Sequence, residues 1–189
     1  MRFMQSRGGV LAVIILAAVV TLQWRHVGRV WPDHSATLAA GTPAPPLELT
    51  DAAGRPIPAS ELAGRTLVVT FWAAWCAPCR RELPELAEVV GQWNDQAPNA
   101  DSAVLLAINE SDEVNSLSMF LEDPRLRSVR FAFDRTGATG ERWSVAGFPT
   151  TVLVDKDGRI RRIQEGYDRQ FASWLARYLH GDDEPEQPQ

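Results

Sequence analysis

The sequence predicts an α/β fold whose central sheet contains strands of both directions. Two observations support this prediction. Short apolar runs typical of strands alternate with segments of helical periodicity along the body of the chain. The last two runs, 150–154 and 159–164, are joined at 155–158 by the turn sequence Asp-Lys-Asp-Gly, which indicates an antiparallel hairpin.

The N-terminal segment 1–25 is predicted to be a transmembrane signal anchor. Residues 8–24 carry no charge and are rich in Val, Leu, Ile and Ala; as a helix they would span roughly 26 Å, close to a ~30 Å hydrocarbon core. Arg7 and Arg25 lie at the two ends, where charged side chains reach the interface. The alternative is a cleaved secretory signal, but the nearest small-X-small site, at 37–39, follows the apolar run about fifteen residues too late.

A linker and one domain are predicted to follow this anchor. Residues 26–40 show no sustained period and are expected to be the linker, and the domain is expected over 41–180. Its N-terminal extension reads as a short strand at 47–50 and a weak second strand at 55–58, which its prolines confine to a sheet edge. One helical turn is expected at 60–64, ended by a glycine.

A buried strand and a long helix form the centre of the predicted domain. The strand covers 67–72 and is the first strongly apolar run of the domain. The helix covers 79–93, and its apolar positions fall on one face, namely Leu83, Leu86, Val89, Val90 and Trp93. Pro84 lies inside this helix and is expected to kink it, because proline lacks the backbone N–H that a helix interior needs.

The remaining elements continue the alternation. We expect a strand at 104–108, a helix at 114–121, a strand at 129–133, one or two helical turns at 137–143, the hairpin, and an amphipathic helix at 171–179. The acidic, proline-containing tail at 181–189 is expected to be disordered.

Composition excludes several classes of function. The chain has 19 basic and 24 acidic residues, and residues 1–40 hold four arginines but only one acid, so the remainder is strongly acidic. An acidic body argues against a nucleic-acid partner, which needs clustered Lys and Arg. The three histidines lie outside the expected core, which disfavours a zinc site, and Arg80 after Cys79 excludes a Cys-X-X-Cys-His haem attachment. We therefore expect neither a metal nor another cofactor.

The only two cysteines, Cys76 and Cys79, lie where a strand changes into a helix. Unpaired N–H groups and the helix dipole favour a thiolate at that position, so Cys76, at the exposed end, is the expected nucleophile. Cys79 would lie on the same side of the helix and could close a disulfide with it. A purely structural disulfide is the alternative. The intervening Ala77 and Pro78 supply no positive charge, so Cys76 is expected to be less acidic than in a strong oxidant.

The motifs of the chain resemble those of the thioredoxin superfamily. They are Phe-Trp-Ala-Ala-Trp-Cys-Ala-Pro-Cys at 71–79, Pro84, and Gly-Phe-Pro-Thr at 147–150 before a strand. More narrowly, the sequence resembles the membrane-anchored TlpA/ResA/CcmG (DsbE) group of extracytoplasmic thiol–disulfide oxidoreductases. That group has a similar Gly-X-Pro-Ala-Pro start, matched from residue 41, and an insertion between the two thioredoxin halves, matched at 110–133.

The resemblance implies a thioredoxin-like fold, a mixed sheet flanked by helices with an N-terminal extension and a central insertion. It also implies site roles. Cys76 and Cys79 would be the redox disulfide, and Glu82 would hold a proton near them. Pro149 would follow a cis bond, and the backbone of Phe148 would pair with substrate as an added strand. Trp75 would shield the disulfide.

Two positions depart from the family pattern. Thioredoxin has a buried aspartate six residues before its first cysteine, where this chain has Thr70, so Glu82 is the expected substitute for its proton-transfer role. Phe148 is bulkier than the Ile, Val or small residue usual before the cis-proline, which indicates a different substrate preference.

The resulting prediction is an extracytoplasmic thiol–disulfide oxidoreductase anchored in the bacterial inner membrane, with its catalytic domain on the periplasmic side. By resemblance it would reduce disulfides of partner proteins such as apocytochrome c and receive electrons from a membrane thiol reductase. The alternatives are an oxidant or isomerase of the same fold, or a non-catalytic copper-handling module. A thiol peroxidase is disfavoured because Ala73 stands where those proteins have Thr or Ser. The copper module is disfavoured because related copper proteins have three residues between their cysteines and add a histidine.

Overall fold

The computed structural model describes residues 38–97, 101–110 and 117–182. The anchor predicted at 1–25, all but the end of the linker, and the tail beyond residue 182 lie outside the described residues. Within the described ranges, no helix is both long and apolar enough to cross a membrane.

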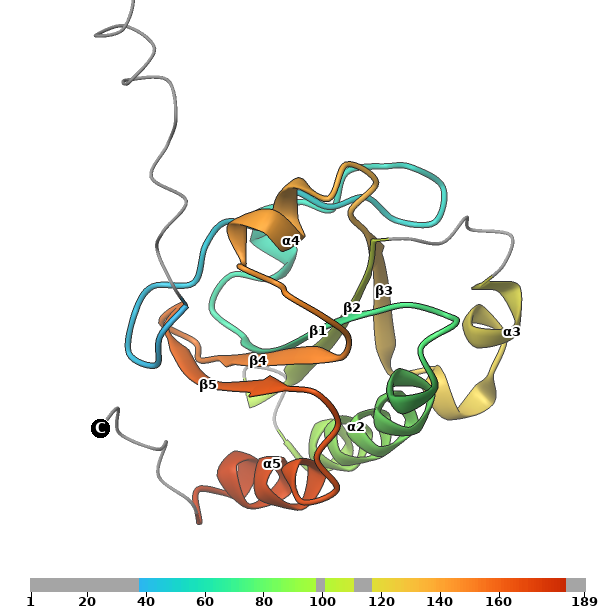
Figure 1. The fold of residues 1–189 in the computed structure, drawn as a ribbon. Helices are drawn as coiled ribbons and strands as arrows, with labels where there is room; N and C mark the ends of the chain where they lie inside the picture. Colours follow the sequence, from blue (N-terminus) through green and yellow to red (C-terminus); the bar gives the residue numbers. More distant parts are fainter. Residues whose placement is uncertain (1–37, 98–100, 111–116, 183–189) are drawn as a thin grey trace, which may run out of the picture. The chain divides into compact units, whose positions relative to one another are not determined.

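A five-stranded mixed sheet forms the centre of the domain, in the order β3-β2-β1-β4-β5 (Figure 1). The strands are β1 (Thr66–Trp72), β2 (Ala103–Asn109), β3 (Val129–Phe133), β4 (Thr150–Val154) and β5 (Ile160–Glu165). The first three run parallel, whereas β4 is antiparallel to both β1 and β5. The predicted α/β class, the mixed direction and the C-terminal hairpin are therefore confirmed.

Helices cover the two faces of the sheet unequally (Figure 1). The long α2 (Ala77–Gln96) and α5 (Phe171–His180) pack on one face, and the short α4 (Ala138–Arg142) lies on the other. The 3₁₀ turn η1 (Ala59–Glu61) belongs to the same side as α4. Between β2 and β3, the described residues of the insertion include α3 (Ser118–Leu121) and a second 3₁₀ turn, η4 (Pro124–Leu126).

Alternation along β1 explains why this strand is central. Val68, Thr70 and Trp72 point toward α2, while Leu67, Val69 and Phe71 point to the opposite face. All seven residues of β1 are buried, since both faces are covered and both edges are paired. Each fully buried large apolar side chain contributes roughly 1.5–3 kcal/mol, so β1 supports both halves of the core.

The N-terminal extension differs from the prediction. In place of strands at 47–50 and 55–58, only Thr50 forms bridges, to Pro56 and to Phe133. The prolines explain this result, because a residue without an N–H cannot continue a ladder of hydrogen bonds. The chain instead attaches further upstream: Gly41 N–H donates to Ile160 O (2.7 Å), and Ala44 N–H donates to Gly158 O (2.8 Å).

The predicted helices are present with shifted ends. Helix α2 begins two residues before the predicted start and continues past Trp93 to Gln96, with Pro84 inside it. Because Pro84 has no N–H, the carbonyl of Arg80 loses its usual helical partner. Of the helix predicted at 114–121, the structure has Ser118–Leu121, and 114–116 lie outside the described residues.

Candidate active site

The two cysteines form a disulfide at the N-terminus of α2, directly after β1. Cys76 is the N-cap of the helix, and its Sγ accepts a hydrogen bond from the backbone N–H of Cys79 (3.2 Å). The S–S distance is 2.03 Å. Pro78 occupies the first turn of the helix, where a missing N–H costs nothing. The sulfur of Cys76 is thus held against the positive end of the helix dipole, which stabilises a thiolate there after reduction.

The disulfide is less accessible than the sequence predicted. Cys76 was expected at an exposed end, but only 4% of its surface is exposed, and Cys79 is fully buried. Both cysteines belong to the apolar core on the α2 face, with Ala73 and partly buried Phe148 in the same cluster. Cys76 remains the more accessible of the two sulfur-bearing residues, so the expected order of attack agrees with the geometry.

Trp75 and the loop before β4 come together beside the disulfide. The Trp75 side chain is 67% exposed, and its ring lies 6.0 Å from that of Phe148 between centroids. The Phe148–Pro149 peptide bond is cis, as expected. Pro149 O accepts a hydrogen bond from Gly166 N–H (2.8 Å), whereas neither backbone group of Phe148 bonds to another described residue.

Glu82 lies one helical turn after Cys79, inside the core. It is only 3% exposed. Its Oε2 accepts hydrogen bonds from the hydroxyls of Thr151 (3.1 Å) and Thr70 (3.4 Å). Its Oε1 is buried and has no partner among the described residues. Burial has the largest effect and raises the pKa of Glu82 to about 7. The hydrogen bonds from the two threonine hydroxyls oppose this rise, and the negative charge of Glu85 adds a smaller rise.

A carboxyl group with a pKa near neutrality can both accept and donate a proton under ordinary conditions. Glu82 therefore has the protonation chemistry that thiol–disulfide exchange requires next to a cysteine pair. Every residue that the sequence singled out falls in this one region: Cys76, Cys79 and Glu82 on α2, and Phe148 with Pro149 across from them. Trp75 forms the exposed part of the same site.

One member of the site, Thr151, was missed in the sequence. It is fully buried on β4, directly opposite Thr70 of β1 in the antiparallel register. A buried hydroxyl requires a hydrogen-bond partner, so a threonine within the apolar run 150–154 was the available signal. Thr70 stands out in the sequence only as a departure from thioredoxin, yet its hydroxyl donates a hydrogen bond to the Glu82 carboxylate.

A second perturbed carboxyl lies after β2. Burial, and then repulsion from Asp134, raise the pKa of Glu110 to about 7. Asp134 accepts hydrogen bonds from the backbone N–H groups of Thr139 (2.7 Å) and Gly140 (2.9 Å). The Glu110 carboxylate lies against Gly140 where a Cβ would overlap it. Glu110 has no predicted role, and both it and Asp134 contact Gly140 of α4, on the sheet face opposite the disulfide.

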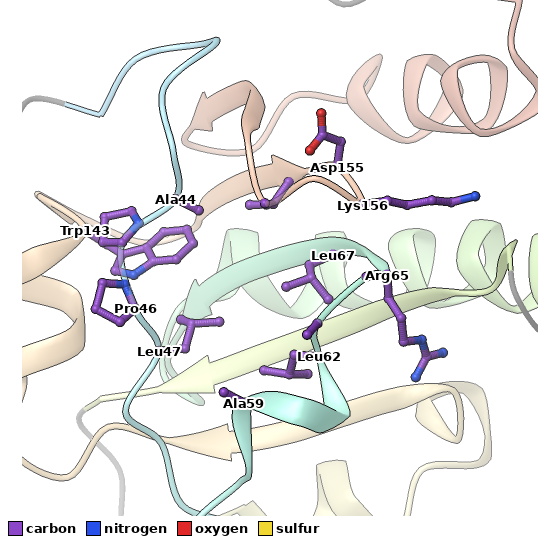
Figure 2. A pocket seen from close by; sticks show the side chains of 15 residues that line it. Ala44, Pro46, Leu47, Ala59, Leu62, Arg65, Leu67, Trp143, Asp155 and Lys156 are labelled. Carbon is purple, nitrogen blue, oxygen red and sulfur yellow. The ribbon is translucent and has the colours of Figure 1, made fainter.

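An apolar pocket of about 220 Å³ lies on the α4 side of the sheet (Figure 2). Figure 2 shows Trp143, Pro46 and Leu47 on one side of it and Leu62 and Leu67 on another. Its lining includes none of the disulfide, Glu82 or cis-proline residues, so it is separate from the redox site.

The fold and the site together define a thioredoxin-like dithiol–disulfide protein: a disulfide at a helix N-terminus, a cis-proline loop beside it, and a buried carboxyl behind it. The Redoxin family model matches residues 39–176, and the chain belongs to that family.

Relatives and solved structures agree with this assignment. The chain is 31% identical to thiol-disulfide oxidoreductase ResA of Geobacillus kaustophilus over 162 residues, covering 86% of this chain and 89% of the relative. It is 30% identical to thiol:disulfide interchange protein HelX of Rhodobacter capsulatus over 152 residues, covering 79% and 81%. A crystal structure of a DsbE-type thiol:disulfide interchange protein from Chlorobium tepidum superposes with a TM-score of 0.65 at 23% identity, covering 77% of this chain and 99% of that one. The protein is a thiol–disulfide oxidoreductase of the ResA/TlpA/CcmG type.

Proposed function

We propose that this protein is an extracytoplasmic reductant that transfers electrons to disulfides of partner proteins through Cys76 and Cys79. The observation that carries the proposal is the carboxyl group of Glu82 buried on the turn of α2 that follows Cys79. When ionised, a carboxylate near the sulfurs disfavours a second negative charge on them, which favours the disulfide form and hence a reducing pair.

In the first step the Cys76 thiolate attacks one sulfur of a substrate disulfide. The substrate S–S bond breaks, its electron pair goes to the leaving sulfur, and a mixed disulfide forms. The thiol of Cys79 then gives its proton to Glu82 and attacks Cys76 Sγ. The second substrate sulfur leaves as a thiolate, so the substrate gains two electrons and the pair becomes the disulfide.

Substrate would be held by the exposed groups beside the disulfide. The backbone N–H and C=O of Phe148 would pair with an extended substrate segment, and Pro149 would fix the course of that loop. The exposed Trp75 ring would cover the reacting sulfurs. Since Phe148 packs against Trp75, its bulk would select substrates with small side chains next to the reacting cysteine.

The partner and the place of action follow from the resemblance and from the segment at 1–25. Apocytochrome c is the proposed substrate and a membrane thiol reductase the proposed electron donor. Residues 1–25 would anchor the chain in the bacterial inner membrane, with the domain on the periplasmic side. Fusing reporters that are active only outside or only inside the cytoplasm to the C-terminus tests this orientation.

The reduction potential of the purified chain at pH 7 tests the direction of electron flow. We expect a value near that of thioredoxin, about −270 mV, rather than near that of DsbA, about −120 mV. A potential close to the DsbA value would make the protein an oxidant. Tight copper binding that disappears in Cys76→Ser, together with no turnover of disulfides, would instead favour the copper-handling alternative.

A further inference from the structure

Three oxygen atoms form a closed triangle between the central strands and α2. Thr151 Oγ1 lies 2.9 Å from Thr70 Oγ1 and 3.1 Å from Glu82 Oε2, and Thr70 Oγ1 lies 3.4 Å from the same carboxylate oxygen. Both threonines are fully buried. They are register partners on neighbouring antiparallel strands, so the backbone fixes their separation.

The hydroxyl pair fits both protonation states of the carboxyl group. A hydroxyl donates one hydrogen and accepts through its lone pairs, whereas an ionised carboxylate only accepts. When Glu82 is ionised, each threonine hydroxyl can donate to Oε2. Alternatively, one hydroxyl donates to the other, which in turn donates to Oε2. When Glu82 is protonated on Oε1, Oε2 is a carbonyl oxygen and still accepts a hydrogen bond from a threonine hydroxyl. An aspartate in place of Thr70 would instead set a second negative charge beside Glu82.

The two carboxylate oxygens therefore have different surroundings. Oε2 is held by the threonines, while Oε1 is buried without a partner among the described residues. An unsatisfied buried oxygen is costly, which makes it the better site for gaining a proton.

We infer that Thr70 and Thr151 are positioning residues for Glu82: they hold Oε2 in both protonation states and leave Oε1 as the oxygen that exchanges a proton with the cysteine pair. This inference rests on the proposed role of Glu82. In the resolving step the S–H bond of Cys79 breaks, an O–H bond forms at Oε1, and the Cys79 sulfur attacks Cys76 Sγ. The S–S bond between Cys76 and the substrate breaks, and the substrate sulfur leaves as a thiolate.

Burial has the largest effect on the pKa of Glu82, and the two threonine hydroxyls come next, ahead of the one charged group among the described residues that acts on it. From its own helix, Glu85 raises the pKa of Glu82, and Glu85 itself accepts a hydrogen bond from the Tyr167 hydroxyl (2.9 Å). Strands β1 and β4 present the two uncharged threonines to it. In the oxidised chain the cysteines do not titrate, so the Glu82 carboxyl can be followed alone.

The test is a ¹³C NMR titration of the Glu82 carboxyl in the oxidised full chain, with Thr151→Val and Thr70→Val. Valine keeps the shape of threonine but removes the donor, so we expect the pKa of Glu82 to rise above its starting value of about 7, by roughly one unit for Thr151→Val. Thr151→Ser should restore the original value. Thr66→Val is the matched control, because Thr66 is buried on the same strand and face but four residues away. An unchanged Glu82 titration in both valine variants would overturn the inference.

A second measurement needs no variant. In the oxidised wild-type chain, the side-chain resonances of Thr70 and Thr151 should shift with the same midpoint as the Glu82 carboxyl, and those of Thr66 should not. Threonine resonances that ignore the Glu82 titration would also overturn the inference. Both readouts are independent of reduction potential and substrate, so an oxidising potential would refute the proposed direction of flow while leaving this result intact.

Discussion

Burial raises the pKa of both Glu82 and Glu110 to about 7, but the groups around the two carboxyls differ. Glu82 is almost completely buried and is held by two hydroxyls from the central strands. Glu110 is only partly buried, and its second cause is the charge of Asp134 at the end of the neighbouring strand. One carboxyl follows a cysteine on its own helix; the other faces a second carboxyl away from the disulfide cluster.

The difference shows that a perturbed pKa alone does not identify a catalytic group. Burial and like charges act wherever the fold packs acids closely, and ion clusters at the ends of strands are common places for them. Position relative to the reacting atoms decides the role. Glu82 shares a helix face with Cys79, whereas the Glu110 carboxylate lies against Gly140 of α4, on the opposite face of the sheet.

The largest expected difference between the two acids is in rate. In Glu82→Gln we expect the resolution of a mixed disulfide at pH 8 to fall about 100-fold, because the base that accepts the Cys79 proton is gone. The wild-type rate should rise with pH through about 7 as the carboxylate forms, and the variant should lose this rise. Stopped-flow release of a chromogenic thiol measures both quantities. Glu110→Gln is the matched control. An equal fall in the resolution rate of Glu110→Gln would contradict the different roles assigned to Glu82 and Glu110.

The second largest difference between Glu82 and Glu110 should be in how each affects the pH dependence of the free energy of unfolding. The folded-state pKa of Glu82 is raised from 4.5 to about 7, so between these values the folded chain binds more protons than the unfolded one. Wild-type stability should therefore fall as pH rises from about 4.5 to 7. Glu82→Gln removes this penalty and should raise the free energy of unfolding at pH 8 by up to about 3 kcal/mol, with no gain near pH 4.

Urea denaturation of the oxidised chain at the two pH values provides the measurement. Glu110→Gln should give a smaller gain at pH 8, because solvent screens a partly exposed carboxyl. A larger gain in the free energy of unfolding for Glu110→Gln than for Glu82→Gln would contradict the conclusion that Glu82 is the more strongly desolvated carboxyl.

Asp134→Asn should change the pKa of Glu110 but not that of Glu82. Removing the Asp134 charge removes the repulsion, so the pKa of Glu110 should move down toward its ordinary value while that of Glu82 stays at about 7. The same change weakens the charged hydrogen bonds to Thr139 and Gly140 and should cost on the order of 1–2 kcal/mol of stability. Carboxyl NMR titration reports the first effect and thermal unfolding the second.

Gly140→Ala should have the smallest effect. The added Cβ overlaps the carboxylate of Glu110, whose Oε1 has no hydrogen bond to lose among the described residues, so the side chain can turn away from Gly140 toward solvent. We expect the pKa of Glu110 to fall and the stability to change by only about 0.5 kcal/mol. A large loss of stability would show that Glu110 is fixed in place more firmly than its surroundings indicate.

The same contrast shows how far the sequence could predict this molecule. The strand–helix junction at Cys76, the hairpin and the cis-proline loop are each marked by a short run of neighbouring residues, so they could be predicted from the sequence. Glu82 could be predicted because helical spacing places it one turn after Cys79.

What could not be predicted depends on register and on packing across the sheet. The Thr70–Thr151 pair exists because β1 and β4 meet in one register, and nothing local to either strand specifies it. Likewise, the burial of Cys76 results from residues far along the chain, Phe148 among them, that pack against the same cluster. The strands predicted at 47–50 and 55–58 are reduced to isolated bridges, because Pro56 and Pro58 lack the N–H groups that a hydrogen-bonded ladder needs.

The attachment of residues 41–44 to the start of β5 has a mechanical consequence. Any pull applied to the chain before Gly41 reaches the sheet through the bonds from Gly41 to Ile160, from Ile160 to Thr42 and from Ala44 to Gly158. Those bonds lie outside the central ladders, so they would rupture first, releasing a few residues of slack while β1 and the disulfide stay intact. Under tension, residues 41–44 would detach from β5 before any force acted on the redox centre. A force–extension record would therefore show a small early step ahead of the main unfolding event.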